Sequence, residues 1–333
     1  MEKKLKRSLT GIRASGNVHL GNYLGAIKPA LERQADYQCL YFIADLHALT
    51  TTKDPQLLRS STLDLVATWL ALGLDVTRNL LYRQSDVPMV TEFAWYLSSC
   101  TGLGLLEKSH AYKDALANDK EVNHATFAYP VLMAADILMY DVDIVPVGKD
   151  QKQHVEMARD MAGSFNAVYG APIIKLPQPV IEESVMLIPG LDGRKMSKSY
   201  GNEIPLFTAE NQLKKLVMSI KTDSTPLEEP KMLSGSLLGD LFKVFADTAT
   251  YDDLEGRLAK GGLGWGHAKA ELFEVINQEL KEPRARYFEL RKDESSLIRL
   301  LKDGAQRAIE IGQPVLNRVR EAIGFPSRSY KPA

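Results

Sequence analysis

The sequence predicts an α/β fold built on a doubly wound parallel sheet, with a helical insertion and an all-helical C-terminal domain. Short apolar runs alternate with segments of helical periodicity in the first part of the chain, as in a parallel sheet covered by helices. Residues 38–44 are almost continuously apolar, which is typical of a strand buried on both faces. After residue 202 helical patterns dominate, and no strand signal of comparable strength follows.

Length and composition are those of an ordinary globular protein. The 333 residues suffice for one large or two ordinary domains, with 45% hydrophobic and 25% charged residues. No apolar run approaches the roughly 20 residues that span a bilayer, and residues 1–10 are basic without the apolar stretch of a signal peptide. We therefore expect a cytoplasmic protein with no membrane partner. Cys39 and Cys100 sit among apolar neighbours and predict buried, reduced thiols.

The charge balance excludes a strongly basic nucleic-acid-binding domain, since the net charge is −1. Residues 267–333 carry thirteen Lys plus Arg against ten Asp plus Glu, which is only weak support for RNA binding. Any contact with RNA must therefore come from local patches.

The first predicted element is a strand at residues 8–12 that runs into a glycine-rich turn and an amphipathic helix over residues 20–31. This arrangement points backbone N–H groups and the positive end of a helix at an anion. His19 and Asn22 stand at the helix start, where they could reach a phosphate or ribose. The alternative is that His19 only caps the helix.

The strand at residues 38–44 ends in Asp45-Leu46-His47. Because the carboxyl ends of parallel strands line the ligand crevice, His47 is a candidate site residue, with a structural histidine as an equally good alternative. Residues 55–74 predict a helix and residues 79–85 the next strand. Residues 88–120 interrupt the alternation and predict a helical insertion, whose apolar content suits either a subunit interface or an extra core layer.

Residues 126–140 predict a helix with one aspartate on an apolar face. Tyr129, Met133, Asp136 and Tyr140 fall at i, i+4, i+7 and i+11. A lone carboxylate there is costly unless a partner satisfies it. The partner is either neighbouring backbone or a ligand donor in a pocket walled by Met133 and aromatic rings.

A strand at residues 143–148 follows, in which Val145 and Val147 point the same way. It runs into polar residues 149–154 at the start of a helix that reaches about Phe165, and residues 182–189 predict the last strand. Next comes the lysine loop, residues 193–201, in which Lys195 and Lys198 stand between flanking glycines. Such a loop can close over a polyphosphate, and the alternative is a solvated basic surface loop.

The remaining chain predicts helices at residues 209–221, 237–249 and 267–325, with breaks at Pro283, Gly304 and Gly312. Residues 261–266 are rich in glycine and predict a flexible joint. We place the domain boundary after residue 205, which gives domains of residues 1–205 and 206–333.

Two pairs of motifs resemble a known family. His19-Leu-Gly-Asn22 and Lys195-Met-Ser-Lys-Ser199 resemble the HIGH and KMSKS motifs of class I aminoacyl-tRNA synthetases. Residues 129–140 and 145–154 resemble the bacterial tryptophanyl-tRNA synthetases in particular. The resemblance runs in order from about residue 7 to residue 207.

The resemblance implies a Rossmann catalytic domain over residues 1–205, with a helical insertion at about residues 88–142 and the KMSKS loop at 195–199. Residues 206–333 would form a helical anticodon-binding domain. The implied activity is formation of tryptophanyl-adenylate from L-tryptophan and ATP with Mg²⁺, followed by transfer to the terminal adenosine of tRNA(Trp). A cytoplasmic homodimer is also implied.

The resemblance also implies roles for individual residues. Lys195 and Lys198 would stabilise the transition state, His19 and Asn22 would hold ATP, and Asp136 would accept the indole N–H. No protein residue is implied as a metal ligand. The residues implied to contact ATP are Arg13, Ala14, Ser15, Gly21, Asn22, Gly148, Lys149, Asp150, Lys195, Met196, Ser197, Lys198 and Ser199. Those implied to contact tryptophan are His47, Tyr129, Met133, Asp136, Val145, Val147 and Gln151.

The chain departs from the family at two places. Arg13-Ala14-Ser15 stands where the family usually carries Gln-Pro-Ser, which leaves the roles of Arg13 and Ala14 open. Leu9 stands where the family often has an aromatic residue, so part of the pocket wall differs.

Three other functions compete with this interpretation. A tyrosyl-tRNA synthetase shares the fold, but a polar residue is expected where Met133 stands. A small-molecule nucleotidylyltransferase is usually shorter and leaves the helical domain without a purpose. A non-catalytic RNA-binding paralogue predicts loss of Lys195, Lys198 or His19, and all three are present.

Overall fold

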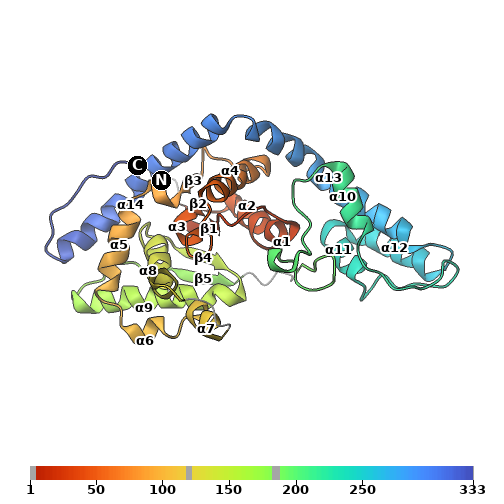
Figure 1. Cartoon of the computed structure of the whole chain (residues 1–333). Helices are drawn as coiled ribbons and strands as arrows, with labels where there is room; N and C mark the ends of the chain where they lie inside the picture. The colour runs from red at the N-terminus through yellow and green to blue at the C-terminus, as the bar shows by residue number, and fades with distance from the viewer. Residues whose placement is uncertain (1–4, 118–121, 182–187, 333) are drawn as a thin grey trace.

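The computed structural model describes residues 5–117, 122–181 and 188–332 (Figure 1). A single parallel sheet of five strands has the order β3-β2-β1-β4-β5. The strands are β1 (Arg7–Arg13), β2 (Gln38–Ala44), β3 (Leu80–Arg83), β4 (Ile144–Val147) and β5 (Gln178–Ile181). The strand order reverses between β1 and β4, so the crevice of this doubly wound sheet lies beyond their carboxyl ends. The predicted fold class is confirmed.

The last described strand, β5, lies directly before the strand predicted at residues 182–189. It covers Gln178–Ile181, and residues 182–187 of the predicted strand lie outside the described residues. β5 pairs with β4 from Ile144 opposite Gln178 to Val147 opposite Ile181. The other four strands lie where the sequence predicts them, to within two residues at each end.

Helices cover both faces of the sheet and form the insertion (Figure 1). The helical segment predicted over residues 20–31 is confirmed, with a π-helical turn, η1, in its middle. The helical elements up to the lysine loop are α1 (Leu20–Asn22), η1 (Tyr23–Ile27), α2 (Lys28–Glu32), η2 (Arg33–Ala35), α3 (Asp45–Ala48), α4 (Pro55–Ala71), η3 (Gln84–Asp86), α5 (Met89–Ser98), α6 (Leu103–Leu106), α7 (His110–Ala117), α8 (His124–Leu138), η4 (Lys149–Gln151) and α9 (Lys152–Val168).

One prediction about α8 is wrong. Tyr140 does not share its apolar face, because the helix ends at Leu138 and Met139 is its C-cap. Tyr140 is buried after the helix, where its ring meets the edge of Tyr82 with the ring centroids 5.8 Å apart.

The remaining elements are helical, as predicted. They are η5 (Lys198–Tyr200), α10 (Glu210–Met218), α11 (Leu237–Phe245), α12 (Thr248–Ala259), α13 (Trp265–Arg291) and α14 (Glu294–Ala322). The breaks predicted at Pro283, Gly304 and Gly312 are wrong, because all three residues lie inside α13 or α14. A Cβ added to Gly304 would lie 1.9 Å from the carbonyl oxygen of Leu81, so this glycine serves close packing of α14 on β3 rather than a helix end.

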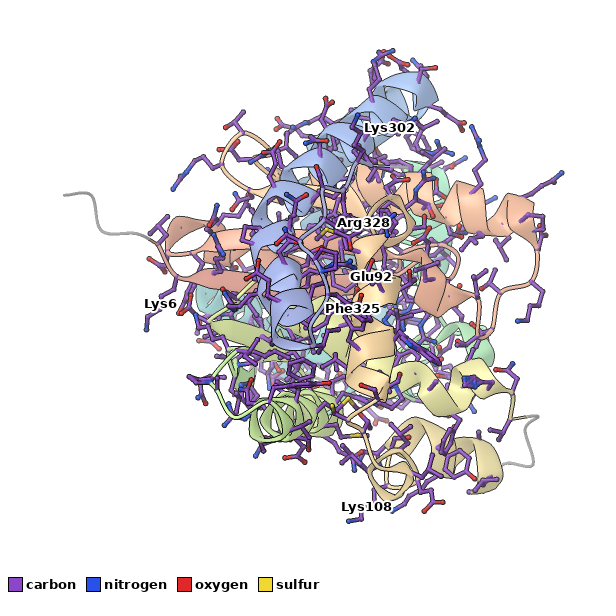
Figure 2. All side chains as sticks on the ribbon, turned by 90° about the vertical axis from the view of Figure 1, so that its left-hand side faces the viewer. Lys6, Glu92, Lys108, Lys302, Phe325 and Arg328 are labelled. Atoms are coloured by element: carbon purple, nitrogen blue, oxygen red, sulfur yellow. The ribbon has the colours of Figure 1, made fainter. Side chains whose placement is uncertain are left out.

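The last helix returns to the sheet. α10, α11 and α12 lie away from the sheet and pack with α13, whereas α14 runs back across the molecule beside β3 and α5 (Figure 1). Glu92 of α5 accepts hydrogen bonds from Arg320 of α14 and from the Tyr330 hydroxyl, and its Oε2 lies 3.9 Å from Arg328 Nη1 (Figure 2). The domain boundary after residue 205 stays a prediction, but α14 is packed on the first part of the chain.

The two cysteines are free; Cys39 is buried and Cys100 is half-buried. No helix in the described part of the chain combines the length and the apolarity that crossing a bilayer requires.

Candidate active site

Two hollows meet beyond the carboxyl ends of β1 and β4. The first is a cavity of about 330 Å³ between β1, β2, β4 and α8, which we call the deep cavity. The second is a more open cleft of about 600 Å³ between the glycine turn, the start of α1 and the lysine loop, which we call the phosphate cleft. Residues that line both hollows are Ile12, Arg13, Gly25, Ala26 and Gly148. A ligand in one hollow can therefore touch a ligand in the other.

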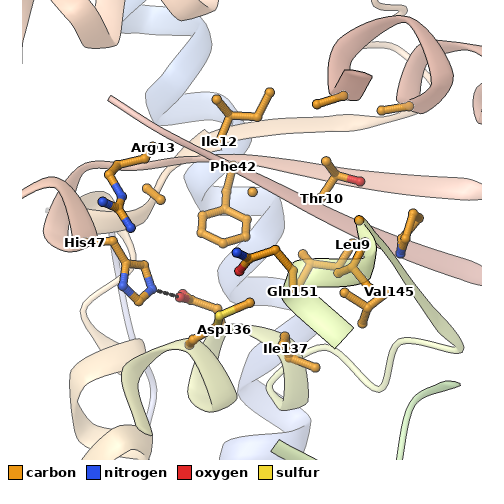
Figure 3. A pocket seen from close by; sticks show the side chains of 18 of the residues that line it. Leu9, Thr10, Ile12, Arg13, Phe42, His47, Asp136, Ile137, Val145 and Gln151 are labelled. Carbon is orange, nitrogen blue, oxygen red and sulfur yellow. Dashed lines mark hydrogen bonds and ion pairs between the residues drawn. The ribbon is translucent and has the colours of Figure 1, made fainter. Parts of the chain in front are cut away.

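Asp136 is the acidic group of the deep cavity and is 1% exposed. Its Oδ2 accepts hydrogen bonds from His47 Nε2 (2.9 Å) and Gln84 Nε2 (2.7 Å), and Figure 3 shows the contact with His47. Its Oδ1 has no hydrogen-bond partner among the described residues. Burial raises the pKa of Asp136, and the donors on Oδ2 oppose that shift. A buried carboxylate with one unpaired oxygen is a site for a ligand N–H.

The walls of the deep cavity are apolar. The side chains of Leu9, Met133, Ile137, Val145 and Val147 line it, which agrees with the predicted orientation of Val145 and Val147. The Phe42 ring lies across Gly11, where an added Cβ would come within 2.3 Å of the ring. Figure 3 shows this ring between the strands and Asp136. Sequence reasoning missed Phe42, because its position opposite Gly11 is set by the β1–β2 register, which only the structure shows.

Polar side chains stand at the mouth of the deep cavity. Arg13 Nη2 donates to the Tyr129 hydroxyl at 3.2 Å, and the Arg13 guanidinium lies 5.5 Å from the centre of the Tyr129 ring. The Tyr129 ring in turn lies 4.5 Å from the His47 ring. Gln151 Oε1 accepts from His154 Nδ1 at 3.0 Å. Arg13 therefore carries positive charge to the junction of the two hollows.

His19 caps α1 and also lines the phosphate cleft. Its Nδ1 accepts from the Asn22 backbone N–H (3.3 Å), and Asn22 Oδ1 accepts from the His19 backbone N–H (3.2 Å). Burial, together with the Lys198 charge, lowers the pKa of His19 to about 4, so the ring is neutral at pH 7. With Nδ1 accepting, the proton of the neutral ring sits on Nε2. The two predicted roles of His19 are compatible, because the cap leaves a donor for a ligand.

The lysine loop is anchored on α1 by Met196. Its side chain is buried, and its Sδ accepts from the Gly21 backbone N–H at 3.3 Å. A Cβ added to Gly21 would lie 3.0 Å from His19 Nδ1 and 3.5 Å from Met196 Cβ. Gly21 thus lets the loop pack against the start of the helix. The Ser197 backbone N–H donates to Asn202 Oδ1 at 2.9 Å, which orders the loop from its other side.

Lys198 spans the phosphate cleft. Its Nζ donates to the backbone oxygen of Ser15 in the glycine turn at 2.6 Å. The atom also lies 3.3 Å from the position of a Cβ on Gly16, whose φ of +86° favours glycine. Burial lowers the pKa of Lys198. Lys195 is exposed and lines the same cleft. Lys198 therefore reaches the glycine turn, and Lys195 lines the same cleft, where an anion would lie.

Most of the predicted ligand residues line one or both hollows. In the deep cavity these are Arg13, His47, Tyr129, Met133, Asp136, Val145, Val147, Gly148 and Gln151. In the phosphate cleft they are Arg13, Ser15, His19, Gly21, Asn22, Gly148, Lys195, Met196, Ser197 and Lys198. Ala14 is buried in the core instead, and Lys149 lies in η4 outside the described linings of both hollows. The side chains of Asp150 and Ser199 lie outside the described residues.

Sequence reasoning also missed Gln84. It follows β3 directly, as His47 closely follows β2, so the rule that singled out His47 would have found it. Its side chain reaches Asp136 from the far edge of the sheet.

Comparisons with known proteins identify the family of the chain. Residues 1–281 match the family described as tRNA synthetases class I (W and Y). The chain is 46% identical to a tryptophan--tRNA ligase of Xylella fastidiosa, over 97% of this chain and 77% of that protein. It is 43% identical to a tryptophan--tRNA ligase of Fusobacterium nucleatum, over 98% of this chain and all of that protein.

Solved structures give the same result. The crystal structure of tryptophanyl-tRNA synthetase from Campylobacter jejuni, complexed with ADP and tryptophan, superposes with a TM-score of 0.91 at 45% identity. The match covers 96% of this chain and 100% of that one. A tyrosyl-tRNA synthetase from Aeropyrum pernix shares the fold, with a TM-score of 0.63 at 18% identity. The chain belongs to the class I tRNA synthetases, in the family of the tryptophan--tRNA ligases.

Proposed function

We infer that the protein is a tryptophan--tRNA ligase that forms tryptophanyl-adenylate from L-tryptophan and ATP and then charges tRNA(Trp). The observation that carries this inference is the unpaired Oδ1 of Asp136 in an apolar cavity that opens onto a cationic cleft. Of the known amino-acid side chains, the indole combines a large apolar body with a single N–H donor.

The deep cavity selects the amino acid. The indole lies between Phe42, Met133 and the two valines of β4, and its N–H donates to Asp136 Oδ1. Phenylalanine would leave this carboxylate oxygen unpaired, which makes it a poor substrate. A tyrosine phenol would need partners of its own, and Met133 offers none. Tyr129 and Gln151 hold the α-amino group at the mouth.

The phosphate cleft performs the chemistry. The tryptophan carboxylate attacks the α-phosphate of ATP, an oxygen–phosphorus bond forms, and the bond to the β-phosphate breaks as pyrophosphate leaves. His19 donates through Nε2, Asn22 at the end of α1 lines the cleft, and Lys195 and Lys198 neutralise charge that develops on the leaving group. The terminal adenosine hydroxyl of tRNA then attacks the adenylate carbonyl and displaces AMP. No enzyme nucleophile is needed.

ATP is expected to bring Mg²⁺ with it. No carboxylate is among the described residues that line the phosphate cleft, whereas the triphosphate supplies the oxygen ligands that Mg²⁺ prefers. When bound there, the ion adds positive charge at the leaving pyrophosphate. Gly148 and the segment at Lys149 and Asp150 follow β4 next to the cleft and lie toward the ribose and adenine in this proposal.

The partners beyond the small substrates are tRNA(Trp) and a second copy of the chain. Helices α10 to α13 extend away from the sheet and supply the surface for the anticodon (Figure 1). Large apolar side chains are exposed on the consecutive helices of the insertion, with Trp95 at 75%, Leu103 at 67% and Leu116 at 54%. A homodimer would cover them. In this proposal the protein acts in the cytoplasm, where it charges tRNA.

The dimer is tested by light scattering after gel filtration. Trp95→Asp should shift the mass from twice 37.0 kDa to the monomer. Phe288→Asp, at an exposed phenylalanine of α13, is the matched control and should leave the dimer intact. A wild-type protein that is monomeric at micromolar concentration would contradict the proposal.

The activity is tested by amino-acid-dependent exchange of labelled pyrophosphate into ATP, with tryptophan, tyrosine and phenylalanine in parallel and no tRNA present. Exchange with tryptophan alone supports both the reaction and the role of the deep cavity. Exchange with tyrosine alone would contradict tryptophan as the substrate. Exchange with none of the three amino acids would contradict the proposed activity.

A further inference from the structure

Gln84 is a fully buried polar residue whose amide lies against Asp136. It is 0% exposed at the end of β3, and its Nε2 donates to Asp136 Oδ2 at 2.7 Å. Its Oε1 accepts from the Leu46 backbone N–H (3.1 Å) and lies 3.4 Å from the His47 backbone nitrogen. Because these donors occupy Oε1, the amide can only present Nε2 to Asp136.

The segment that carries Gln84, at the end of β3, is fixed by hydrogen bonds to the start of α3. The neighbouring Ser85 donates through its backbone N–H (3.0 Å) and its hydroxyl (2.5 Å) to the two oxygens of Asp45. Asp45 begins α3, the same helix turn whose backbone holds Gln84 Oε1. The ends of β2 and β3 are therefore tied together, and the Gln84 amide projects from them toward α8.

Both donors to Asp136 act on the same oxygen. His47 Nε2 and Gln84 Nε2 hold Oδ2, while Oδ1 has no partner among the residues that the structure describes. With one donor on each oxygen, both oxygens would keep some capacity to accept, but neither would be left wholly to a ligand. Two donors on one oxygen fix the rotation of the carboxylate and leave the other oxygen for a ligand.

We propose that Gln84 is a positioning residue for substrate selection, which holds Asp136 so that Oδ1 faces the indole N–H. The proposal rests on the proposed function of the deep cavity. Gln84 lines neither hollow itself, so it acts on the ligand through Asp136. Its loss should weaken recognition of the N–H group and leave the rest of the substrate unaffected.

The experiment compares tryptophan with 3-benzothienylalanine, in which sulfur replaces the indole N–H, in the pyrophosphate exchange reaction. In Gln84→Met, which keeps the length of the side chain and removes its donor, kcat/KM for tryptophan should fall about tenfold or more. The fall should appear chiefly in KM, since Asp136 does not touch the reacting carboxylate. For the sulfur isostere, kcat/KM should change less than about threefold.

Gln84→Glu is the second variant and keeps the acceptor for the backbone of α3. It replaces the donor by a carboxylate next to Asp136, and it should lower the tryptophan-to-isostere ratio at least as much as Gln84→Met does. Gln34→Met, at a residue bonded to the Asp75 backbone away from both hollows, should leave the ratio unchanged.

Equal losses for both substrates in both Gln84 variants would show a purely structural role and overturn the proposal. Wild-type kinetics in both variants would overturn it as well. If wild-type protein exchanged with tyrosine and not with tryptophan, the proposed function itself would fail, which this wild-type control separates from a failure of the Gln84 proposal.

Discussion

The deep cavity and the phosphate cleft lie side by side but are built in opposite ways. In the deep cavity most buried polar groups bind one another, and Asp136 Oδ1 and His47 Nδ1 lack a partner among the described residues. In the cleft, groups from the distant lysine loop meet the glycine turn, and Lys195 is exposed. The cavity is pre-organised by the sheet edge, whereas the cleft is assembled across residues that are far apart in the sequence.

The difference matches what each hollow has to do. Selection of an indole needs one acceptor in one place, which a rigid, buried network supplies without cost when the ligand binds. Stabilisation of a leaving pyrophosphate needs charge that comes close as the reaction proceeds, and long lysine side chains on a loop can supply it. Damage to the cavity should therefore appear mainly in KM for tryptophan, and damage to the cleft mainly in kcat.

The largest effect is expected for Lys198→Ala. The rate of adenylate formation should fall about 10³-fold, because a charge that acts on the transition state is lost. The dissociation constant of tryptophan, measured by calorimetry, should change less than about threefold. Lys292→Ala, at an exposed lysine that pairs with Glu289, is the control. Equal losses in rate and in tryptophan binding would contradict the assignment of catalysis to the phosphate cleft and of tryptophan binding to the deep cavity.

Asp136→Asn should damage the deep cavity and leave the phosphate cleft unchanged. The amide oxygen would turn to His47 and Gln84, so its NH₂ group would face the indole N–H. We expect KM for tryptophan to rise about 10²-fold, with a much smaller change in kcat. The measurement is pyrophosphate exchange over a range of tryptophan concentrations. Unchanged discrimination against phenylalanine and tyrosine would argue against the role of Asp136.

His19→Asn tests the cleft more narrowly. The asparagine oxygen can keep the cap on α1, while the Nε2 donor is lost, so exchange should slow about 30-fold with little change in Tm at pH 7. The expected pH dependence has a definite sign. The pKa of His19 is lowered from 6.5 to about 4, so the folded protein resists protonation that the unfolded chain accepts.

The free energy of unfolding of the wild type should therefore fall relative to that of His19→Asn as the pH drops from 6.5 through about 4. Urea titrations at several pH values measure it. A difference between the two proteins that does not vary with pH would show that His19 is not held neutral by the fold.

The smallest effect is expected for Arg13→Gln, at the residue that belongs to both hollows. Arg13 is exposed and bonds the Tyr129 hydroxyl, so its charge is screened by solvent. We expect KM for tryptophan and KM for ATP to rise together by about fivefold, as measured by steady-state exchange. A change in only one of the two constants would assign Arg13 to a single hollow.

The sequence by itself determined the parts of this protein that depend on local pattern. Alternating apolar runs and helical segments were enough for the parallel sheet, and four short motifs were enough for the family. Val145, Val147, Asp136 and His47 could be placed because strand alternation, helix periodicity and the strand-end rule are local geometry.

Only the tertiary structure decided which long-range contacts give those residues their chemistry. Gln84 and Phe42 carry no motif, and their roles come from Asp136 and Gly11 on other elements. Gly304 and Gly312 look like helix breaks in the sequence, yet packing of α14 on β3 and α5 keeps them helical. A local sequence pattern predicts the conformation of its own segment. Which distant residue contacts a buried polar group or packs on a glycine is decided by the packing of the whole chain.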